Sequence, residues 1–89
     1  MRKIFSDRGF KDFLDWQEQD RKTFKKITDL IKDIERNGES NGIGKPEALK
    51  GDLQGRFSRK IDEKNRLVYR ITDDNAIEIT QCKGHYSDK

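Results

Sequence analysis

The strongest constraint on the fold is the short spacing of three strand-like segments in the second half of this 89-residue chain. They cover about residues 55–61, 66–72 and 76–82, and polar stretches of three or four residues separate them. Such stretches suit hairpin turns, whereas parallel neighbours need crossovers of a dozen or more residues. We therefore predict an antiparallel three-stranded meander.

The first half of the chain predicts two helices that follow a short strand at residues 2–5. Ser6 and Asp7 offer N-cap chemistry for a helix to about Gln19, and Asp20 offers it for a second helix to about Arg36. The second helix carries apolar side chains spaced three and four residues apart: Phe24, Ile27, Leu30, Ile31 and Ile34. The predicted order is β-α-α-β-β-β, an α+β two-layer fold in which a helical hairpin packs on an antiparallel sheet. Residues 1–89 are expected to form a single domain.

Between the two halves, residues 39–44 read as a flexible loop, and residues 45–49 are expected to begin a short helical turn because Pro46 suits its first position. Alternation places Leu67 and Tyr69 on the helix-covered face of their strand, with Arg66, Val68 and Arg70 on an open, cation-bearing face. In the preceding strand, alternation places the charged Arg59 on the same face as the apolar Phe57 and Ile61. A bulge or a strand end would move Arg59 off that face.

Composition and charge narrow the class of function. Although 42% of residues are charged, the net charge is only +3, and residues 45–70 hold eight basic against four acidic side chains. This local excess suits a polyanion, and a solvated mixed surface is the equal alternative. One cysteine and one histidine predict no internal disulfide and no metal site. The absence of a long apolar run predicts a cytoplasmic protein without membrane association.

Three residues could together cleave RNA without a metal or other cofactor. The reaction needs a base for the 2′-hydroxyl, a cation for the pentacoordinate phosphate and an acid for the departing 5′-oxygen. Glu47, Arg66 and His85 supply one candidate for each role. Tyr86, which directly follows His85 in the sequence, could stack on a base.

Each candidate also has a purely structural interpretation. Glu47 could favour a helical turn through the backbone dipole, Arg66 could form an ion pair with Glu78 or Asp62, and His85 could simply be exposed near the chain end. Tyr86 could cover a sheet edge. Two further residues are expected to be buried rather than reactive: Cys82 as a small hydrophobe and Trp16 in helix packing.

The candidates fall within four segments that carry a resemblance: Gly-Lys-Pro-Glu-Ala-Leu-Lys (44–50), Phe-Ser-Arg-Lys-Ile (57–61), Arg-Leu-Val-Tyr (66–69) and Cys-Lys-Gly-His-Tyr (82–86). These resemble signature blocks of the YoeB/Txe toxins, within the RelE/ParE superfamily. The helical half is similar too, through Trp-Gln-Glu (16–18) and residues 25–32. The resemblance runs from about Ile4 to Tyr86.

The resemblance implies an mRNA interferase, an endoribonuclease that cleaves messenger RNA in the ribosomal A site and inhibits translation. Glu47 would be the general base, His85 the general acid, Arg66 the transition-state cation and Tyr86 an RNA-positioning residue. It also implies RNA contacts by Lys50, Arg59 and Lys60. The implied inhibitor is a YefM-like antitoxin protein with an acidic C-terminal segment, and a homodimer is left open.

The sequence departs from the family pattern at three places. Gly84 stands where an aromatic residue is frequent, Lys60 replaces a frequent arginine, and residues 87–89 extend beyond the usual terminal tyrosine. These departures are expected to affect rate and specificity.

Two other functions remain open at this stage. One is a non-catalytic ParE-like module that binds a protein target such as DNA gyrase. The other is a basic RNA-binding domain without cleavage, for which affinity would fall steeply with salt.

Overall fold

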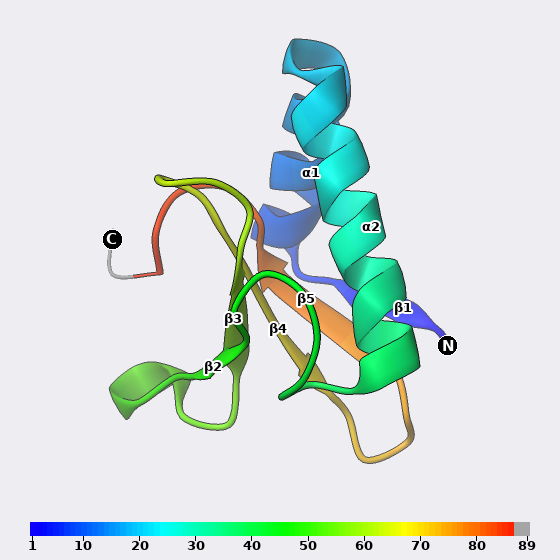
Figure 1. Ribbon diagram of the computed structural model, residues 1–89, viewed down its shortest axis with the longest axis vertical. Coiled ribbons are helices and arrows are strands. Elements are labelled where there is room, and N and C mark those ends of the chain that lie inside the picture. The colour runs from blue at the N-terminus through cyan, green and yellow to red at the C-terminus, as the bar shows by residue number, and fades with distance from the viewer. Residues whose placement is uncertain (87–89) are drawn as a thin grey trace.

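The computed structural model describes residues 1–86, in which two helices lie side by side along one side of a five-stranded sheet (Figure 1). The strand order across the sheet is β1-β5-β4-β3-β2. The α+β two-layer prediction is confirmed. The elements are β1 (Lys3–Phe5), α1 (Asp7–Gln19), α2 (Arg21–Asn37), β2 (Glu47–Ala48), a 3-10 turn (Gly51–Leu53), β3 (Phe57–Lys60), β4 (Arg66–Ile71) and β5 (Ile77–Gln81).

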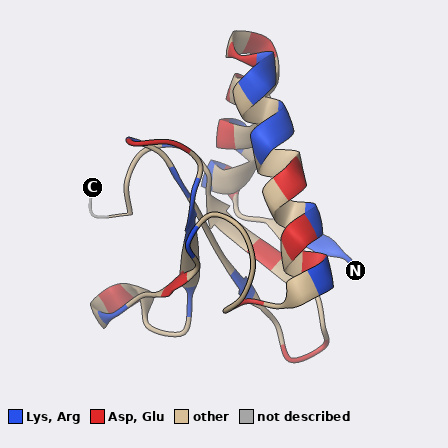
Figure 2. Ribbon diagram, in the orientation of Figure 1, with Lys and Arg blue, Asp and Glu red and all other residues tan. Residues whose placement is uncertain are grey.

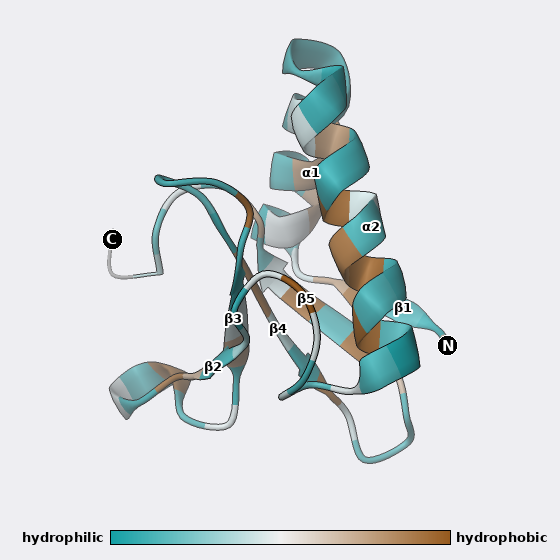
Figure 3. Cartoon of the chain, viewed as in Figure 1, coloured by the Kyte–Doolittle hydropathy of each residue, from teal (hydrophilic) through white to brown (hydrophobic). Residues whose placement is uncertain are grey.

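Both predicted helix starts are confirmed by their capping bonds. The Ser6 hydroxyl accepts a hydrogen bond from the Gly9 N–H at 2.9 Å, and the Asp20 carboxylate accepts one from the Thr23 N–H at 3.2 Å. Gly38, with φ of 86°, ends α2. The hydrophobic residues of α2 face the sheet (Figure 3), and its buried set is Ile27, Leu30, Ile31 and Ile34.

The predicted meander is confirmed, because β3, β4 and β5 pair antiparallel in sequence order. The sheet as a whole is mixed, however, since β1 pairs with β5 in parallel, with Lys3 opposite Ile77 and Phe5 opposite Ile79. The helical hairpin provides the long crossover that parallel neighbours require. The prediction of a wholly antiparallel sheet rested on the short turns, which say nothing of β1.

The predicted helical turn at residues 45–49 is wrong. Glu47 and Ala48 form β2, an edge strand in which Glu47 pairs with Ser58 and Ala48 with Phe57 of β3. The Leu49 N–H then donates to the Arg56 carbonyl at 2.9 Å. Pairing with β3 satisfies backbone groups of both segments, which a single isolated turn could not do.

The two faces of β4 match the predicted alternation with one exception. Leu67 and Tyr69 are fully buried in the core under the helices, as expected. Val68 is fully buried as well, although it points to the opposite face. Its cross-strand neighbours there are Ser58 and Gln81, which are also buried. The face predicted to be open is therefore buried at its centre, and the arginines of β4 lie toward its ends.

Arg59 lies fully buried on the helix-covered face, the same face as its apolar neighbours. It is stable there because it is the centre of a set of hydrogen bonds, called the Arg59 hub below. Its Nε donates to the Tyr69 hydroxyl at 2.9 Å, and that hydroxyl donates to the Glu39 carbonyl. All five guanidinium N–H donors are engaged, since Nη1 and Nη2 donate to the Asp33 carboxylate and to the carbonyls of Ile43, Gly38 and Asn41. Because these partners span α2, β4 and residues 38–44, the hub ties three parts of the fold together.

Two further structural interpretations are confirmed at the contact between α1 and the end of β5. The Trp16 indole N–H donates to the Cys82 carbonyl at 2.8 Å within the core. Cys82 is fully buried, and burial raises the pKa of its thiol to about 12. No helix in the described part of the chain is long and apolar enough to cross a membrane.

Replacing Arg59 with Met is expected to destabilise the fold strongly. The change leaves the Asp33 carboxylate and three loop carbonyls without their buried donor, a loss of about 3–5 kcal/mol for a broken buried pair. Urea unfolding followed by circular dichroism measures it. Arg36→Met is the control, because Arg36 is exposed at the end of α2. Equal unfolding midpoints for the two variants would contradict the hub's role.

The Asp33–Arg59 pair also predicts a dependence of stability on pH. The hydrogen bond from Arg59 lowers the pKa of Asp33 below its ordinary value. Because the folded-state pKa is depressed, the contribution is present above the unfolded pKa of about 4. It is lost as the pH falls through the folded-state value.

The difference in unfolding free energy between the parent and Asp33→Asn, measured from pH 7 down to pH 3, isolates this contribution from other carboxylates. We expect that difference to shrink as the pH falls. A constant difference over the whole range would show that the charge of Asp33 contributes nothing.

Candidate active site

The candidate residues gather on the sheet face opposite the helices, at the end where β2, β3 and β4 meet the C-terminal segment. Glu47 lies opposite Ser58, and Lys60 lies opposite Arg66. Paired residues share a face of a sheet, so these four side chains project to the same side. Together with Lys45 they line a hollow of about 220 Å³, called here the phosphate-side hollow.

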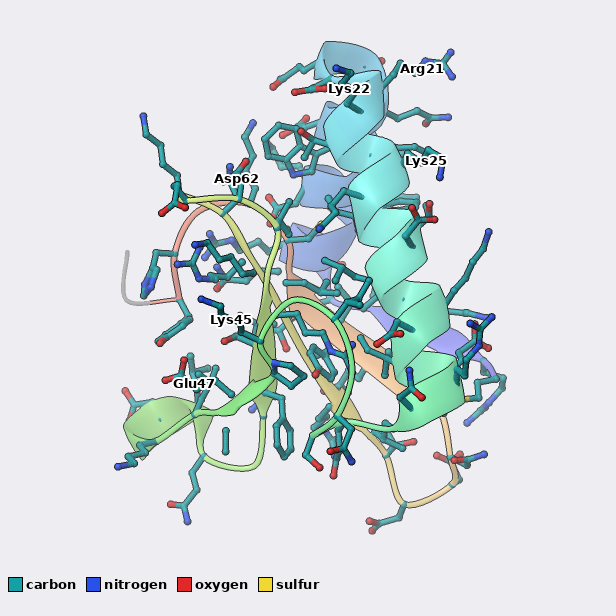
Figure 4. The ribbon with its side chains drawn as sticks, viewed as in Figure 1. Arg21, Lys22, Lys25, Lys45, Glu47 and Asp62 are labelled. Atoms are coloured by element: carbon teal, nitrogen blue, oxygen red, sulfur yellow. The ribbon has the colours of Figure 1, made fainter. Side chains whose placement is uncertain are left out.

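Glu47 reaches this position because the preceding loop is drawn onto the sheet. The Lys60 N–H donates to the Gly44 carbonyl at 2.7 Å. Gly44 has φ of 82°, and a Cβ there would lie 2.9 Å from the Leu30 side chain, so only glycine allows this approach. Lys45 and Glu47 consequently sit over the edge of β3 (Figure 4). Glu47 is exposed.

Arg66 begins β4 and makes no ion pair with a described carboxylate. Its Nη1 donates to the carbonyls of Asp62 at 2.6 Å and Asn65 at 3.1 Å. The alternative ion pair is therefore wrong for both proposed partners. Glu78 instead pairs with Arg70 at 2.9 Å. Within the described chain, the Nε and Nη2 groups of Arg66 remain available to a ligand.

Asp62 lies in the turn between β3 and β4 (Figure 4), and groups of that turn engage its carboxylate. It accepts hydrogen bonds from the N–H groups of Lys64 and Asn65, both at 2.8 Å, and from the Asn65 amide. Burial opposes the ionised form, but these hydrogen bonds outweigh it and lower the pKa of Asp62. The turn is thus fixed by its own side chains, and Arg66 follows directly from it.

The C-terminal segment is anchored on both sides before it reaches His85. The Cys82 N–H donates to the Asp12 carboxylate of α1 at 3.1 Å. Two residues later the Arg66 N–H donates to the Gly84 carbonyl at 3.0 Å, and the Gly84 N–H donates to the Asn65 side chain at 2.8 Å. Gly84 has φ of 82°, a conformation that glycine adopts without strain. His85 therefore leaves the chain next to Arg66.

Tyr86 lies beside His85 and lines a hollow together with Glu47. The His85 and Tyr86 rings lie 4.2 Å apart with an interplanar angle of 33°. Tyr86 also lines a second hollow of about 310 Å³ with Glu47, Ala48, Leu49 and Lys50. Glu47 borders both hollows, so the structure brings Glu47, Arg66, Tyr86 and His85 together at one end of the sheet.

The three predicted RNA contacts have different surroundings. Lys50 is exposed and lines the second hollow, and Lys60 lines the phosphate-side hollow while pairing with Glu63 at 2.9 Å. Arg59 is contradicted as an RNA contact, because it is fully buried and all of its donors are used within the protein. Its place in the Phe-Ser-Arg-Lys-Ile segment gave no sign of this.

Sequence reasoning missed two residues of the site, Lys45 and Ser58, which both line the phosphate-side hollow. Ser58 could have been found from the alternation of β3, since it shares its face with Lys60. Lys45 had no signal beyond its place before Pro46-Glu47.

The remaining surface adds no candidate to this set. A hollow of about 320 Å³ is lined mainly by apolar groups between β1 and the helices, among them Phe5, Phe13 and Ile31. Within residues 1–86, no group of three histidine, cysteine or acidic side chains is placed to hold a metal ion. The extension at residues 87–89 lies outside the described residues. Figure 2 shows basic residues on β3 and β4 and along the outer side of α2.

Comparison with known proteins extends the likeness over nearly the whole chain. Residues 5–86 match the family described as the YoeB-like toxin of bacterial type II toxin–antitoxin systems. Toxin YoeB of Streptomyces coelicolor is 50% identical over 86 residues, which cover 97% of this chain and 100% of the relative.

Two solved structures from Staphylococcus aureus have the same fold. In the heterotetrameric YoeB–YefM toxin–antitoxin complex, the matched chain is 48% identical with a TM-score of 0.90, covering 97% of this chain and 98% of that one. In the YoeB dimer the values are 49% and 0.89 with the same coverage. Sequence, fold and length agree, and the chain belongs to the YoeB-like toxin family of bacterial type II toxin–antitoxin systems.

Proposed function

We propose that this toxin is an endoribonuclease that cleaves messenger RNA in the ribosomal A site and so inhibits translation. The observation that carries the proposal is the meeting of a carboxylate, an arginine and a histidine–tyrosine pair around adjoining hollows. Glu47 and Arg66 line one hollow, and Glu47 and Tyr86 line the next. These side chains can supply every role that the cleavage requires.

The reaction is a transfer of the phosphate within the RNA. Glu47 takes the proton of the 2′-hydroxyl, whose oxygen attacks the adjacent phosphorus. The Nε and Nη2 groups of Arg66 stabilise the charge on the pentacoordinate phosphate. His85 protonates the 5′-oxygen as its bond to phosphorus breaks. The products are a 2′,3′-cyclic phosphate, or a 3′-phosphate after hydrolysis, and a 5′-hydroxyl.

Other residues hold the RNA in place. The Tyr86 ring offers a flat surface for a base next to the attacked ribose. Lys50 and Lys60 add positive charge beside the two hollows, where backbone phosphates would pass. The site works as an open surface rather than an enclosed pocket, which suits a strand presented by a ribosome in the cytoplasm.

Two protein partners complete the proposal. The similar S. aureus toxin is found with YefM and as a dimer, and we propose a YefM-like antitoxin and a homodimer for this chain as well. An acidic antitoxin segment would compete with RNA for the cationic residues of β3 and β4.

The first test adds the toxin to a cell-free translation reaction and maps mRNA 5′ ends by primer extension. Discrete cuts inside codons at stalled ribosomes are expected for the parent. Glu47→Ala and His85→Ala are each expected to lower the cleavage rate by about 10²–10⁴, the contribution of a general base or acid. Both side chains lie outside the core, so melting temperatures should match the parent.

Lys64→Ala serves as the control, because Lys64 is an exposed cation of the neighbouring β3–β4 turn that lines neither hollow. If Glu47→Ala and His85→Ala cut as fast as this control, the assigned roles are wrong. If the parent inhibits growth while mRNA stays intact, the non-catalytic alternative gains support, and DNA gyrase is the next target to assay.

A further inference from the structure

We infer that the phosphate-side hollow binds a phosphate group of the RNA backbone through Lys45 and Ser58, in addition to Arg66. The inference rests on the proposed function, since it names the part of the substrate that this hollow receives. Three features of the hollow carry it: a serine hydroxyl that faces the hollow and has no partner in the described chain, a lysine with a left-handed backbone, and an excess of positive charge.

Ser58 as a whole residue is 3% exposed, and no described residue makes a hydrogen bond to its hydroxyl. Every buried side-chain oxygen and nitrogen of the described residues has a partner, so this hydroxyl is open to solvent at the hollow that Ser58 lines. A serine hydroxyl that no protein group engages and that solvent reaches can donate a hydrogen bond to a ligand. Ser58 lies directly opposite Glu47 and lines the hollow. Its hydroxyl is therefore a donor placed to face whatever fills that space.

Lys45 has φ of 52°, in the left-handed region that residues with side chains rarely occupy. A strained backbone that persists next to a candidate site suggests that its side chain is needed there. The surrounding structure enforces the conformation, because Gly44 is bonded to Lys60 and Ile43 is bonded to Arg59. Lys45 makes no salt bridge to a described carboxylate, so its ammonium group can meet an anion in the hollow.

The charge of the hollow matches a phosphate. Its lining holds three cations, Lys45, Lys60 and Arg66, against the single carboxylate of Glu47. Lys60 is already paired with Glu63, which leaves Lys45 and Arg66 to attract a ligand. A water molecule takes about 30 Å³ of liquid volume, so a hollow of about 220 Å³ has room for the five heavy atoms of a phosphate.

The residues that would bind the phosphate come from different elements of the fold. Arg66 reaches the hollow from β4, Ser58 from β3 and Lys45 from the loop before β2, so donors approach a bound group from three elements. Glu47 stands at the border with the second hollow, where the ribose of the same nucleotide would lie. The phosphate would thus be held beside the base that activates its neighbouring hydroxyl.

The test titrates inorganic phosphate into the full-length toxin and follows amide shifts by NMR, with chloride at equal ionic strength as the reference. Phosphate is expected to shift the amides of residues 45 and 58. Lys45→Asn and Ser58→Ala should each weaken its binding by about tenfold, since a hydrogen bond to a charged group is lost. Lys64→Asn, a neighbouring exposed cation outside the hollow, should leave the affinity unchanged.

Asparagine tolerates a left-handed backbone, so Lys45→Asn should keep the melting temperature of the parent. If it does not fold, Lys45→Gly replaces it, because glycine carries no strain at this φ. Lys45→Arg should restore most of the lost affinity. In the ribosome assay, Lys45→Asn and Ser58→Ala should lower kcat/KM, whereas Lys64→Asn should not.

The outcomes separate this inference from the proposed function. Phosphate binding that is equal in the parent, Lys45→Asn and Ser58→Ala overturns the inference, even if mRNA is cleaved. Binding that depends on Lys45 and Ser58 supports the inference, even if the parent cleaves no mRNA and the endoribonuclease proposal fails.

Discussion

The buried guanidinium of Arg59 is the interaction on which the rest of the structure depends. A charge of this kind is stable inside a protein only when all of its donors are satisfied. Here Asp33 supplies the opposite charge from α2, Tyr69 supplies an acceptor from β4, and residues 38–44 supply three carbonyls. The long connection after α2 is therefore folded against the sheet, although it has little apolar surface of its own.

This arrangement places the site. The loop held by Arg59 ends at Gly44, whose carbonyl accepts from the Lys60 N–H at the end of β3. The next residues are Lys45 and Glu47, so the position of the candidate base follows from the packing of a residue on the other face of the sheet. Arg59 and Lys60 are adjacent in sequence and point to opposite faces, the first structural and the second lining the site.

Local rules were sufficient for the parts of the fold that are set locally. The caps at Ser6 and Asp20, the apolar stripe of α2 and the short turns of the meander each depend on residues close in sequence. The parallel pairing of β1 with β5 joins residues more than 70 positions apart, such as Lys3 and Ile77. Likewise, the burial of Arg59 depends on acceptors far along the chain, and no pattern within β3 reveals them.

The site was predictable where chemistry restricts the residue type and unpredictable where backbone geometry does. His85 is the one histidine of the chain and so was the natural candidate acid, whereas Glu47 and Arg66 were selected from 17 acidic and 20 basic side chains by their place in the segments that resemble the toxin family. The freedom of Arg66 from Glu78 could not be predicted, because it depends on the register in which β4 pairs with β5. In that register Arg70 lies opposite Glu78 and forms a hydrogen bond with it. Since Arg70 pairs with Glu78, Arg66 is the arginine of β4 that makes no ion pair with a described carboxylate.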